Sequence, residues 1–467
     1  MEANFRAFEY TSQDSFIESE YRFTGDTPTG WTITRNDREH LALGPGYRLL
    51  RTMYCGICST DLARIHLPFS LPQVIGHEAV AADPATGRDY VVEINDTCAA
   101  RGDRSPEIFC ASGLATHCPD RMVLGIDRLP GGFGPWLLAP VNACVPVEGL
   151  ALRTAALAEP FAAALHAVGT SRPRAGDSVA VVGPGRLGLL IIAALSSCRA
   201  AAGGFTVTAL GRSGKTRKAA IALGADSAED IKDYGGRSRG QFDLVFDASG
   251  TMEGFEASLR LARREVHLKS TSGREFHGMK HLTGLVVDEL SLLPPGPDSP
   301  DFHWDNEDRV NEWVYVAPGA GGYDLPERYR AHRGDAASAG ALLTTGAFRG
   351  RLPRFDIAIA SSMEEIDACI RPSTGHELSL VRPRGAIVVA QNGDNNPLLR
   401  FCASGGRVRT SRCGDLRQAV QTLRQHGATA ALLEKNIITH EFPASRLPEA
   451  YEMAKKGPAI KVLVRHD

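Results

Sequence analysis

The stretch Ser178-Val179-Ala180-Val181-Val182-Gly183-Pro184-Gly185-Arg186-Leu187-Gly188 decides the fold of this chain. A short apolar strand leads directly into a G-x-G-x-x-G loop, and residues 189–197 have the apolar spacing of a helix. In this context Gly183 permits the tight turn, Gly185 lets the backbone approach a pyrophosphate, and Gly188 lets helix and strand pack closely. The free N–H groups at the start of the helix suit phosphates. We therefore predict a dinucleotide-binding unit whose cofactor contacts include Arg186 and Leu187.

The next predicted strand indicates which dinucleotide is bound. Residues 206–210 form this strand, which ends at Gly211. An NAD site normally has Asp or Glu here, where it binds the ribose 2′-hydroxyl. This chain has Arg212, Ser213 and Lys215 instead, and these groups suit a 2′-phosphate. We expect NADP(H) to be preferred over NAD(H); the alternative is that Arg212 and Lys215 are solvated surface charges.

Further strands alternate with helices downstream. Residues 242–250 form a strand that ends in small residues, where Ser249 is a candidate cofactor contact, and residues 265–271 form the next strand. This alternation indicates an α/β fold with a doubly wound parallel sheet. A second pair of strands, at 355–362 and 385–390, loosely echoes the first pair. It is either a partial internal repeat or two ordinary strands joined by a helix.

Composition and charge exclude several classes of protein. The 467 residues exceed one ordinary core, so two or three domains are expected. A net charge of −2 argues against nucleic acid and anionic membrane as partners. No apolar run reaches the roughly 18 residues of a membrane span, and the N-terminus has no signal-peptide pattern. The ten cysteines then favour reduced thiols and metal ligands, and the expected compartment is the cytoplasm.

A second group of reactive residues lies in the irregular β-rich region before the glycine loop. Residues 53–61 include Cys55, Cys58, Thr60 and Asp61, and Gly76-His77-Glu78 follows. A thiolate, an imidazole and carboxylates together suit zinc, and three ligands with an open fourth position make a catalytic site. A redox C-x-x-C formed by Cys55 and Cys58 is the alternative, although its usual βα context is missing.

With both motifs, the chain resembles the zinc-dependent medium-chain dehydrogenase/reductase superfamily, the alcohol and polyol dehydrogenases. The resemblance covers roughly residues 40–293 and 405–467. The motifs come in the family's order: C-x-T-D, G-H-E, an aromatic-glycine segment, Glu159-Pro160 and the glycine loop. The family implies a GroES-like β-rich catalytic domain followed by a Rossmann domain with a large insertion. The implied domain limits are 1–165 for the catalytic domain, 166–405 for the Rossmann domain with its insertion at about 294–405, and 406–467 for the end of the Rossmann domain and the return to the catalytic domain.

The resemblance also implies the metal ligands. Cys58, not Cys55, matches the family's zinc thiolate, and His77 matches the histidine ligand. Glu78 matches a glutamate that lies close to the metal as an alternating or outer ligand. The third ligand is Glu159, whose alternative role is that of an acid favoured by the dipole at a helix N-terminus. One catalytic zinc per chain is expected.

The activity implied by the resemblance is hydride transfer between NADP(H) and an alcohol or carbonyl compound, such as a polyol or another hydroxy compound. Thr60 matches the hydroxyl that takes the alcohol proton, and Asp61 is placed to orient the zinc histidine. Together with Glu78 they are the predicted catalytic residues. Many relatives continue the proton relay with a histidine where this chain has Ala63, so the outer proton path is left open.

Many relatives also carry a structural zinc lobe with four cysteines, and this chain departs from that pattern. Cys110 and Cys118 fit the last two positions, whereas the first two fall on Arg104 and Glu107. Cys98 lies too far upstream to fit this register. We therefore expect no structural zinc.

The insertion is a further departure, and it leaves several possibilities open. It lies near the sheet edge through which such dehydrogenases commonly dimerise, and a homodimer or homotetramer is expected. It could cap that edge, build a different interface or reach over a cleft. Two other functions compete with the dehydrogenase: a zinc-free NADPH-dependent reductase of the enone or quinone type, and a catalytically weak nucleotide-binding or scaffold protein.

Overall fold

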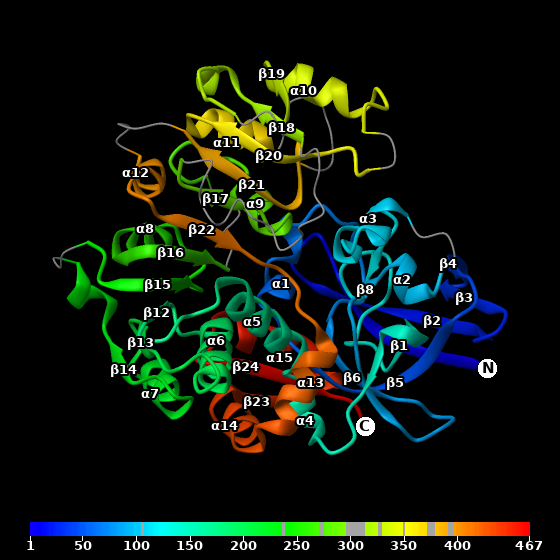
Figure 1. Cartoon of the computed structure of the whole chain (residues 1–467). Helices are drawn as coiled ribbons and strands as arrows, with labels where there is room; N and C mark the ends of the chain where they lie inside the picture. The colour runs from blue at the N-terminus through cyan, green and yellow to red at the C-terminus, as the bar shows by residue number, and fades with distance from the viewer. Residues whose placement is uncertain are drawn as a thin grey trace. The chain divides into compact units, whose positions relative to one another are not determined.

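The structure is a computed structural model that describes residues 1–103, 107–235, 239–269, 275–295, 313–325, 329–348, 351–370, 379–390 and 396–467. The chain forms two compact units, shown in Figure 1. The first contains Met1–Ala163 and Cys413–Asp467, and the second contains Ala164–Arg412. Antiparallel sheets in the first unit and a mainly parallel sheet with helices in the second confirm the predicted α/β class. The functional domain limits stay predictions.

The first unit is built mainly from antiparallel strands. One sheet has the order β1-β2-β3-β4, a seven-stranded sheet has the order β11-β7-β6-β5-β24-β23 with β10 paired to β5, and β8 pairs with β9. The strands are β1 (Glu2–Tyr10), β2 (Phe16–Asp26), β3 (Gly30–Arg35), β4 (Arg38–Leu43), β5 (Tyr47–Gly56), β6 (Glu78–Ala82), β7 (Asp89–Val92), β8 (Asn95–Asp96), β9 (Met122–Val123), β10 (Trp136–Pro140), β11 (Cys144–Pro146), β23 (Ile438–Pro443) and β24 (Lys461–Arg465). Strand β5 is central, because it pairs with β6, β10 and the C-terminal strand β24.

Short helices fill the connections of this unit, and longer ones follow near the C-terminus. They are α1 (Ser59–Leu62), α2 (Cys98–Arg101), α3 (Ile108–Ala111), α4 (Leu152–Ala155), α5 (Ala158–Ser171, which continues into the second unit), α13 (Leu416–Gln425), α14 (Gly427–Ile437) and α15 (Leu447–Lys456). Helix α13 shows why these segments are helical: Asp415 caps its N-terminus, and its buried residues recur at helical spacing. In α15, Tyr451 packs its ring against that of Tyr10, with ring centroids 5.2 Å apart.

The second unit contains one eleven-stranded sheet with the order β14-β13-β12-β15-β16-β22-β17-β21-β20-β18-β19. All neighbours are parallel except β17 and β22. The strands are β12 (Ser178–Val182), β13 (Thr206–Leu210), β14 (Ser227–Glu229), β15 (Phe242–Asp247), β16 (Ala262–Leu268), β17 (Ser291–Leu293), β18 (Trp313–Val316), β19 (Arg330–Arg333), β20 (Phe355–Ala360), β21 (Val381–Val389) and β22 (Arg407–Thr410). The helices are α6 (Arg186–Cys198), α7 (Gly214–Ala222), α8 (Met252–Leu261), α9 (Leu282–Val287), α10 (Ala336–Leu343), α11 (Met363–Ile370) and α12 (Pro397–Ala403). Apolar strands that are buried along their length are typical of such a sheet.

The insertion extends this sheet. Strand β21 pairs in parallel with β17, and β20, β18 and β19 follow outward to the edge, as Figure 1 shows. The core continues across the junction, because Leu292 of β17 and Ile387 of β21 belong to the same buried cluster. The insertion therefore covers the sheet edge that β17 would otherwise present, the first of its three expected roles.

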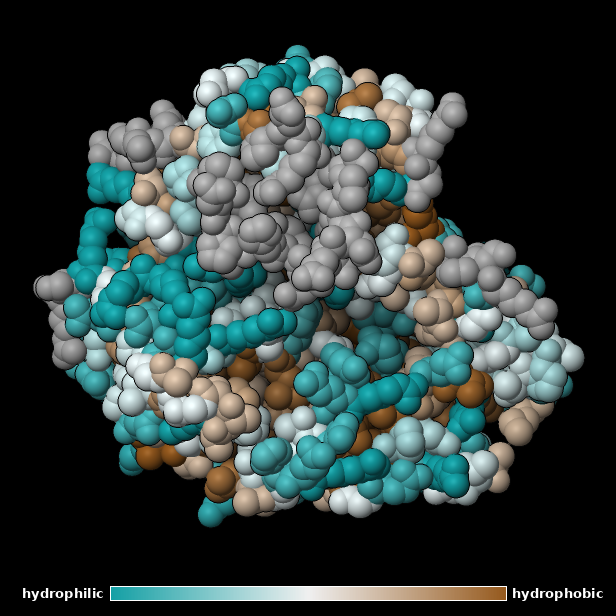
Figure 2. All heavy atoms as spheres, viewed as in Figure 1, coloured by the Kyte–Doolittle hydropathy of each residue, from teal (hydrophilic) through white to brown (hydrophobic). Residues whose placement is uncertain are grey.

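Hydrophilic and hydrophobic residues are interspersed on the face drawn in Figure 2. Among the described residues, the large hydrophobic side chains that are exposed are scattered along the sequence: Met1, Ile17, Ile65, Ile221 and Leu432. Among the described residues, no helix has both the length and the apolar character needed to cross a membrane.

Candidate functional site

Strand β5 ends in a turn that places the predicted thiolate and hydroxyl beside each other. Cys58 precedes the first residue of α1, and its backbone N–H donates to Asp61 Oδ2 at 2.8 Å. This contact folds the turn back on itself, so that Cys58 Sγ lies 3.7 Å from Thr60 Oγ1. Both side chains are partly exposed, whereas Cys55 is fully buried within β5. The structure thus gives Cys58 the accessible position and Cys55 a core position.

His77 lies against the same turn, just before β6. Its Nδ1 atom is 3.2 Å from Asp61 Oδ1, and both side chains are buried. Burial lowers the pKa of the His77 imidazole, but the negative charges of Asp61 and Cys58 outweigh it and raise that pKa well above its ordinary value. Where a metal ion replaces the Nε2 proton, the Nδ1–H that faces the carboxylate favours the tautomer whose Nε2 lone pair can bind that ion.

Glu78 is held by a cation that the sequence analysis missed. Lys461 of β24 forms an ion pair with Glu78, and both side chains are buried. Gly56 leaves room for this pair, because a Cβ there would lie 2.1 Å from Glu78 Oε2. The signal in the sequence was a single lysine in the otherwise apolar stretch 459–464. Glu78 is thus a paired carboxylate close to the predicted zinc ligands.

Glu159, the second residue of α5, lies in the same neighbourhood. Burial raises the pKa of its carboxyl group to about 7, the charge of His77 lowers it, and that of Glu78 raises it. The charges of His77 and Glu78 therefore act on this carboxyl group. Its position in the first turn of the helix also fits the alternative role of a helix-terminal acid.

The donor set of this site fits zinc in kind, since it offers a thiol, an imidazole and a carboxylate. The ligand atoms of Cys58, His77 and Glu159 are not among the groups of three that lie within 4.8 Å of one another in the described part of the chain. The zinc ligand set therefore stays a prediction that rests on the chemistry of these side chains.

A group of three side chains that meets this distance criterion is instead formed by Cys98, Cys110 and Cys118. Cys98 does not fit the four-cysteine spacing in the sequence, but in the fold its Sγ lies 3.6 Å from Cys118 Sγ. Burial raises the pKa of Cys118 to about 12. Glu107 caps α3 by accepting from Phe109 N–H at 2.7 Å, and Arg104 lies outside the described residues. Three thiols are an incomplete tetrahedral set, so the absence of a structural zinc stays a prediction with a weaker basis.

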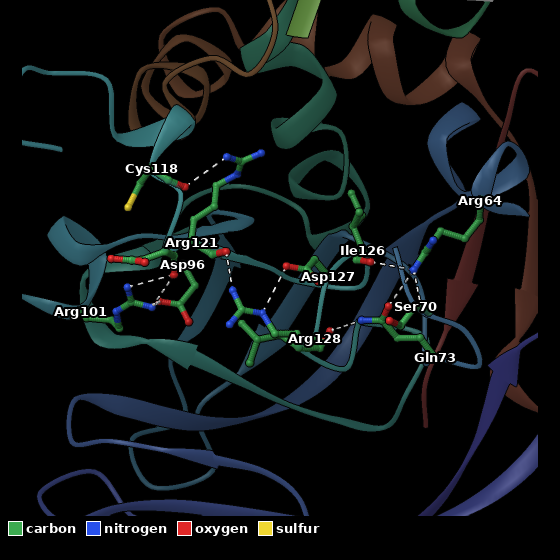
Figure 3. Close-up of polar contacts among 12 residues, drawn as sticks. Arg64, Ser70, Gln73, Asp96, Arg101, Cys118, Arg121, Ile126, Asp127 and Arg128 are labelled. Carbon is green, nitrogen blue, oxygen red and sulfur yellow. Dashed lines mark hydrogen bonds and ion pairs between the residues drawn. The ribbon is translucent and has the colours of Figure 1, made fainter. Parts of the chain in front are cut away.

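Arg64 stands next to the position where many relatives continue the proton relay, and it is engaged elsewhere. Its fully buried guanidinium donates to Phe69 O, Ser70 O, Gln73 Oε1 and Ile126 O at 2.8–3.2 Å. Figure 3 shows Arg64 directed at Ser70, Gln73 and Ile126. These contacts tie two loops together, so Arg64 has a structural role.

In the second unit, the glycine loop has the geometry that the sequence predicts. Gly183 has a φ of +80°, and a Cβ there would lie 2.5 Å from Ser249 Cα. A Cβ on Gly188 would lie 2.3 Å from Gly183 O, whereas one on Gly185 would meet no atom within 4 Å. The loop is therefore closely packed at Gly183 and Gly188 and open at Gly185, where the backbone can approach a ligand. Arg186 starts the helix that follows.

The residues predicted to bind the rest of the cofactor follow β13 and β15. Arg212 is exposed directly after β13, Ser213 precedes the first residue of α7, and Lys215 lies in the first turn of that helix. Ser249 follows β15 and donates its N–H to Asp247 Oδ1 at 3.0 Å. Burial raises the pKa of Asp247 to about 6.

Several known proteins are similar to this chain. It is 34% identical over 158 residues to L-galactonate-5-dehydrogenase of Escherichia coli (strain K12), a match that covers 31% of this chain and 44% of that enzyme. It is 30% identical over 279 residues to 2-dehydro-3-deoxy-L-galactonate 5-dehydrogenase of Pseudoalteromonas atlantica, covering 54% of this chain and 76% of the relative. No family model matches the chain.

Solved structures share the fold. A protein of Sinorhizobium meliloti 1021, described as a zinc-binding dehydrogenase and bound to NADP, has a TM-score of 0.57 at 18% identity and covers 99% of each chain. L-Idonate 5-dehydrogenase of Escherichia coli has a TM-score of 0.55 at 15% identity, covering 100% of this chain and 99% of that one. The chain belongs to the medium-chain dehydrogenase/reductase superfamily, a family of oxidoreductases that includes the alcohol and polyol dehydrogenases.

Proposed function

We propose that this chain is a zinc-dependent oxidoreductase that transfers a hydride between NADP(H) and an alcohol or carbonyl compound with several hydroxyl groups. The observation that carries the proposal is the turn after β5, which brings Cys58, Thr60 and Asp61 together against buried His77. The two relatives compared above are named as dehydrogenases of galactonate derivatives, which supports a polyhydroxy substrate.

In this proposal Cys58, His77 and Glu159 hold one zinc ion, with Glu78 beside them. Bound zinc supplies Lewis-acid polarisation of the substrate oxygen, and the nicotinamide supplies or accepts the hydride. Thr60 Oγ1, which lies next to the Cys58 thiol, takes the proton of the substrate hydroxyl while the hydroxyl proton of Thr60 passes outward to solvent. Asp61 holds the His77 ring in one orientation and one tautomer.

The cofactor is proposed to lie on the glycine loop. Gly183, Gly185 and Gly188 shape the loop for the pyrophosphate, together with Arg186 and Leu187 in the first turn of α6.

Three groups after β13 are proposed to bind the 2′-phosphate. Arg212 and Lys215 supply positive charge and Ser213 a hydroxyl, which is the basis for preferring NADP(H) over NAD(H). Ser249 follows β15 and packs closely against Gly183. A homodimer or homotetramer and a cytoplasmic location stay predictions.

The test measures zinc and turnover on the same preparation. We expect about one zinc per chain bound at this site, and faster oxidation of polyols or hydroxy acids with NADP than with NAD. The Cys58→Ala variant should lose both zinc and turnover. Turnover without zinc would support the zinc-free reductase instead, and bound zinc without turnover on a broad panel would support a scaffold role.

A further inference from the structure

The insertion repeats the strand order of the dinucleotide-binding half. The order is β13-β12-β15-β16 in the first half and β19-β18-β20-β21 in the insertion, and all neighbours in both sets are parallel. In each set the chain runs from the first strand outward to the second, then returns to the other side for the third and fourth. Each set therefore has a switch point between its first and third strands, the place where ligands bind in such sheets.

The third strand of each set makes the same contact with the first. Asp243, the second residue of β15, accepts from the N–H of Ser178, the first residue of β12, at 2.9 Å. Asp356, the second residue of β20, accepts from the N–H of Trp313, the first residue of β18, also at 2.9 Å. Each aspartate follows a phenylalanine and lies at a register shift toward the fourth strand.

The fourth strand of each set supplies the same cation. Arg263, the second residue of β16, forms an ion pair with Asp243. Arg382, the second residue of β21, forms an ion pair with Asp356 over 3.0 Å. The two sets thus share the strand order, the position of the register shift and the Asp–Arg contact.

The helices that follow the third strands also correspond. Helix α8 begins Met-Glu-Gly after the capping residue Thr251, and α11 begins Met-Glu-Glu after the capping residue Ser362. Each capping hydroxyl accepts from the third helical N–H, that of Gly254 at 3.1 Å and that of Glu365 at 3.2 Å. Glu365 therefore stands where the first half has Gly254.

The replacement of glycine by glutamate at this position changes the turn that follows the third strand, which we consider as a phosphate site. In the first half, a Cβ on Gly254 would lie 2.0 Å from Ser249 Oγ, so the position takes no side chain. In the insertion, the Glu365 carboxylate accepts from Gly319 N–H at 2.6 Å, Ser361 N–H at 2.8 Å and Ser361 Oγ at 2.9 Å. Gly319 follows Pro318 after β18, as Gly185 follows Pro184 after β12.

We propose that the insertion is a second copy of the dinucleotide-binding half, in which the Glu365 carboxylate occupies the anion position that a phosphate takes in the first copy. The proposal rests on the dinucleotide site proposed for the first copy. The insertion binds no dinucleotide because its anion position is filled by its own chain. The η6 turn (Pro318–Ala320) also stands where the first copy has the start of α6. Without the Glu365 side chain, the same N–H groups form a site for a phosphate-class anion.

The experiment counts pyrophosphate sites on the full chain by isothermal titration. Glu365→Gly is compared with Glu364→Gly, which removes the same charge and places the same glycine in the exposed neighbouring position of α11. With NADPH saturating the first copy, we expect Glu365→Gly to bind one pyrophosphate, whereas the wild type and Glu364→Gly bind none. Glu365→Gln keeps a side chain of the same size but only one acceptor oxygen, so its pyrophosphate affinity should lie between those of the wild type and Glu365→Gly.

Equal pyrophosphate binding by Glu365→Gly and Glu364→Gly, with both variants folded by circular dichroism, would overturn the proposal. So would a second NADPH or pyrophosphate bound by the wild type with Glu365 in place. A separate titration tests the dinucleotide site proposed for the first copy. Without NADPH the wild type should bind one pyrophosphate at that site, and the absence of binding would refute the first site only. A gain of one site in Glu365→Gly over Glu364→Gly would still support the second copy.

Discussion

His77 Nδ1 lies 3.2 Å from Asp61 Oδ1, and the other oxygen of the same carboxylate accepts the backbone N–H of Cys58. One carboxylate thus contacts two of the predicted zinc ligands. In Asp61→Asn, an amide N–H2 facing Nδ1 favours the tautomer that carries its proton on Nε2. We expect zinc affinity to fall about 10–100-fold, measured by competition with a chelator. Unchanged affinity would show that Asp61 does not orient a ligand.

The variants Cys55→Ala and Cys58→Ala can be compared directly, because the same substitution is made at two positions. Cys58→Ala should remove the bound zinc, as measured by mass spectrometry of metals, with little loss of stability. Cys55→Ala should keep the zinc and lower the free energy of unfolding by about 1–2 kcal/mol, because the thiol is buried beside Gly76 and Gly132. Zinc loss in Cys55→Ala alone would reverse the assignment.

The proposed 2′-phosphate contact predicts the effect of a charge reversal. Arg212→Asp should lower the ratio of kcat/KM for NADPH to that for NADH by about 10–100-fold, because a cation is replaced by an anion beside the phosphate. The control is Arg217→Asp, which changes the same charge on α7 at a residue that pairs with Asp230. An equal change in both variants would indicate a general charge effect.

Buried Asp247 predicts a pH dependence of stability. Its pKa is raised to about 6 in the folded chain, against about 3.9 when unfolded, so the folded state holds the proton between these values. The free energy of unfolding therefore falls as pH rises through this window, by about 2 kcal/mol between pH 4.5 and 7.5. Asp247→Asn keeps an acceptor for Ser249 and should lose this contribution. Urea unfolding of both proteins at the two pH values measures the difference, and parallel curves would contradict it.

The features that could be predicted from the sequence are those that depend on residues close together in the chain. The roles of Gly183 and Gly188 and the strand that begins at Phe242 could be predicted because loop sterics and apolar runs are local. The contacts of Lys461 with Glu78 and of Cys98 with Cys118 could not be predicted, because strand pairing and chain reversal bring these residues together. The sequence alone does not distinguish a repeat from two ordinary strands, because the contact between Asp356 and Trp313 joins residues 43 positions apart.

The repeated strand order has a consequence for folding. Strands β15 and β20 both begin Phe-Asp, and each lies in parallel beside the first strand of its own set. When the chain refolds from denaturant, β15 and β20 can each pair with either β12 or β18. Pairing β15 with β18, or β20 with β12, would bury similar apolar surface and act as a kinetic trap. Synthesis on the ribosome separates them in time, because the strands from β12 to β16 emerge before β18 exists. Vectorial folding therefore selects the native pairing that equilibrium refolding must find by search.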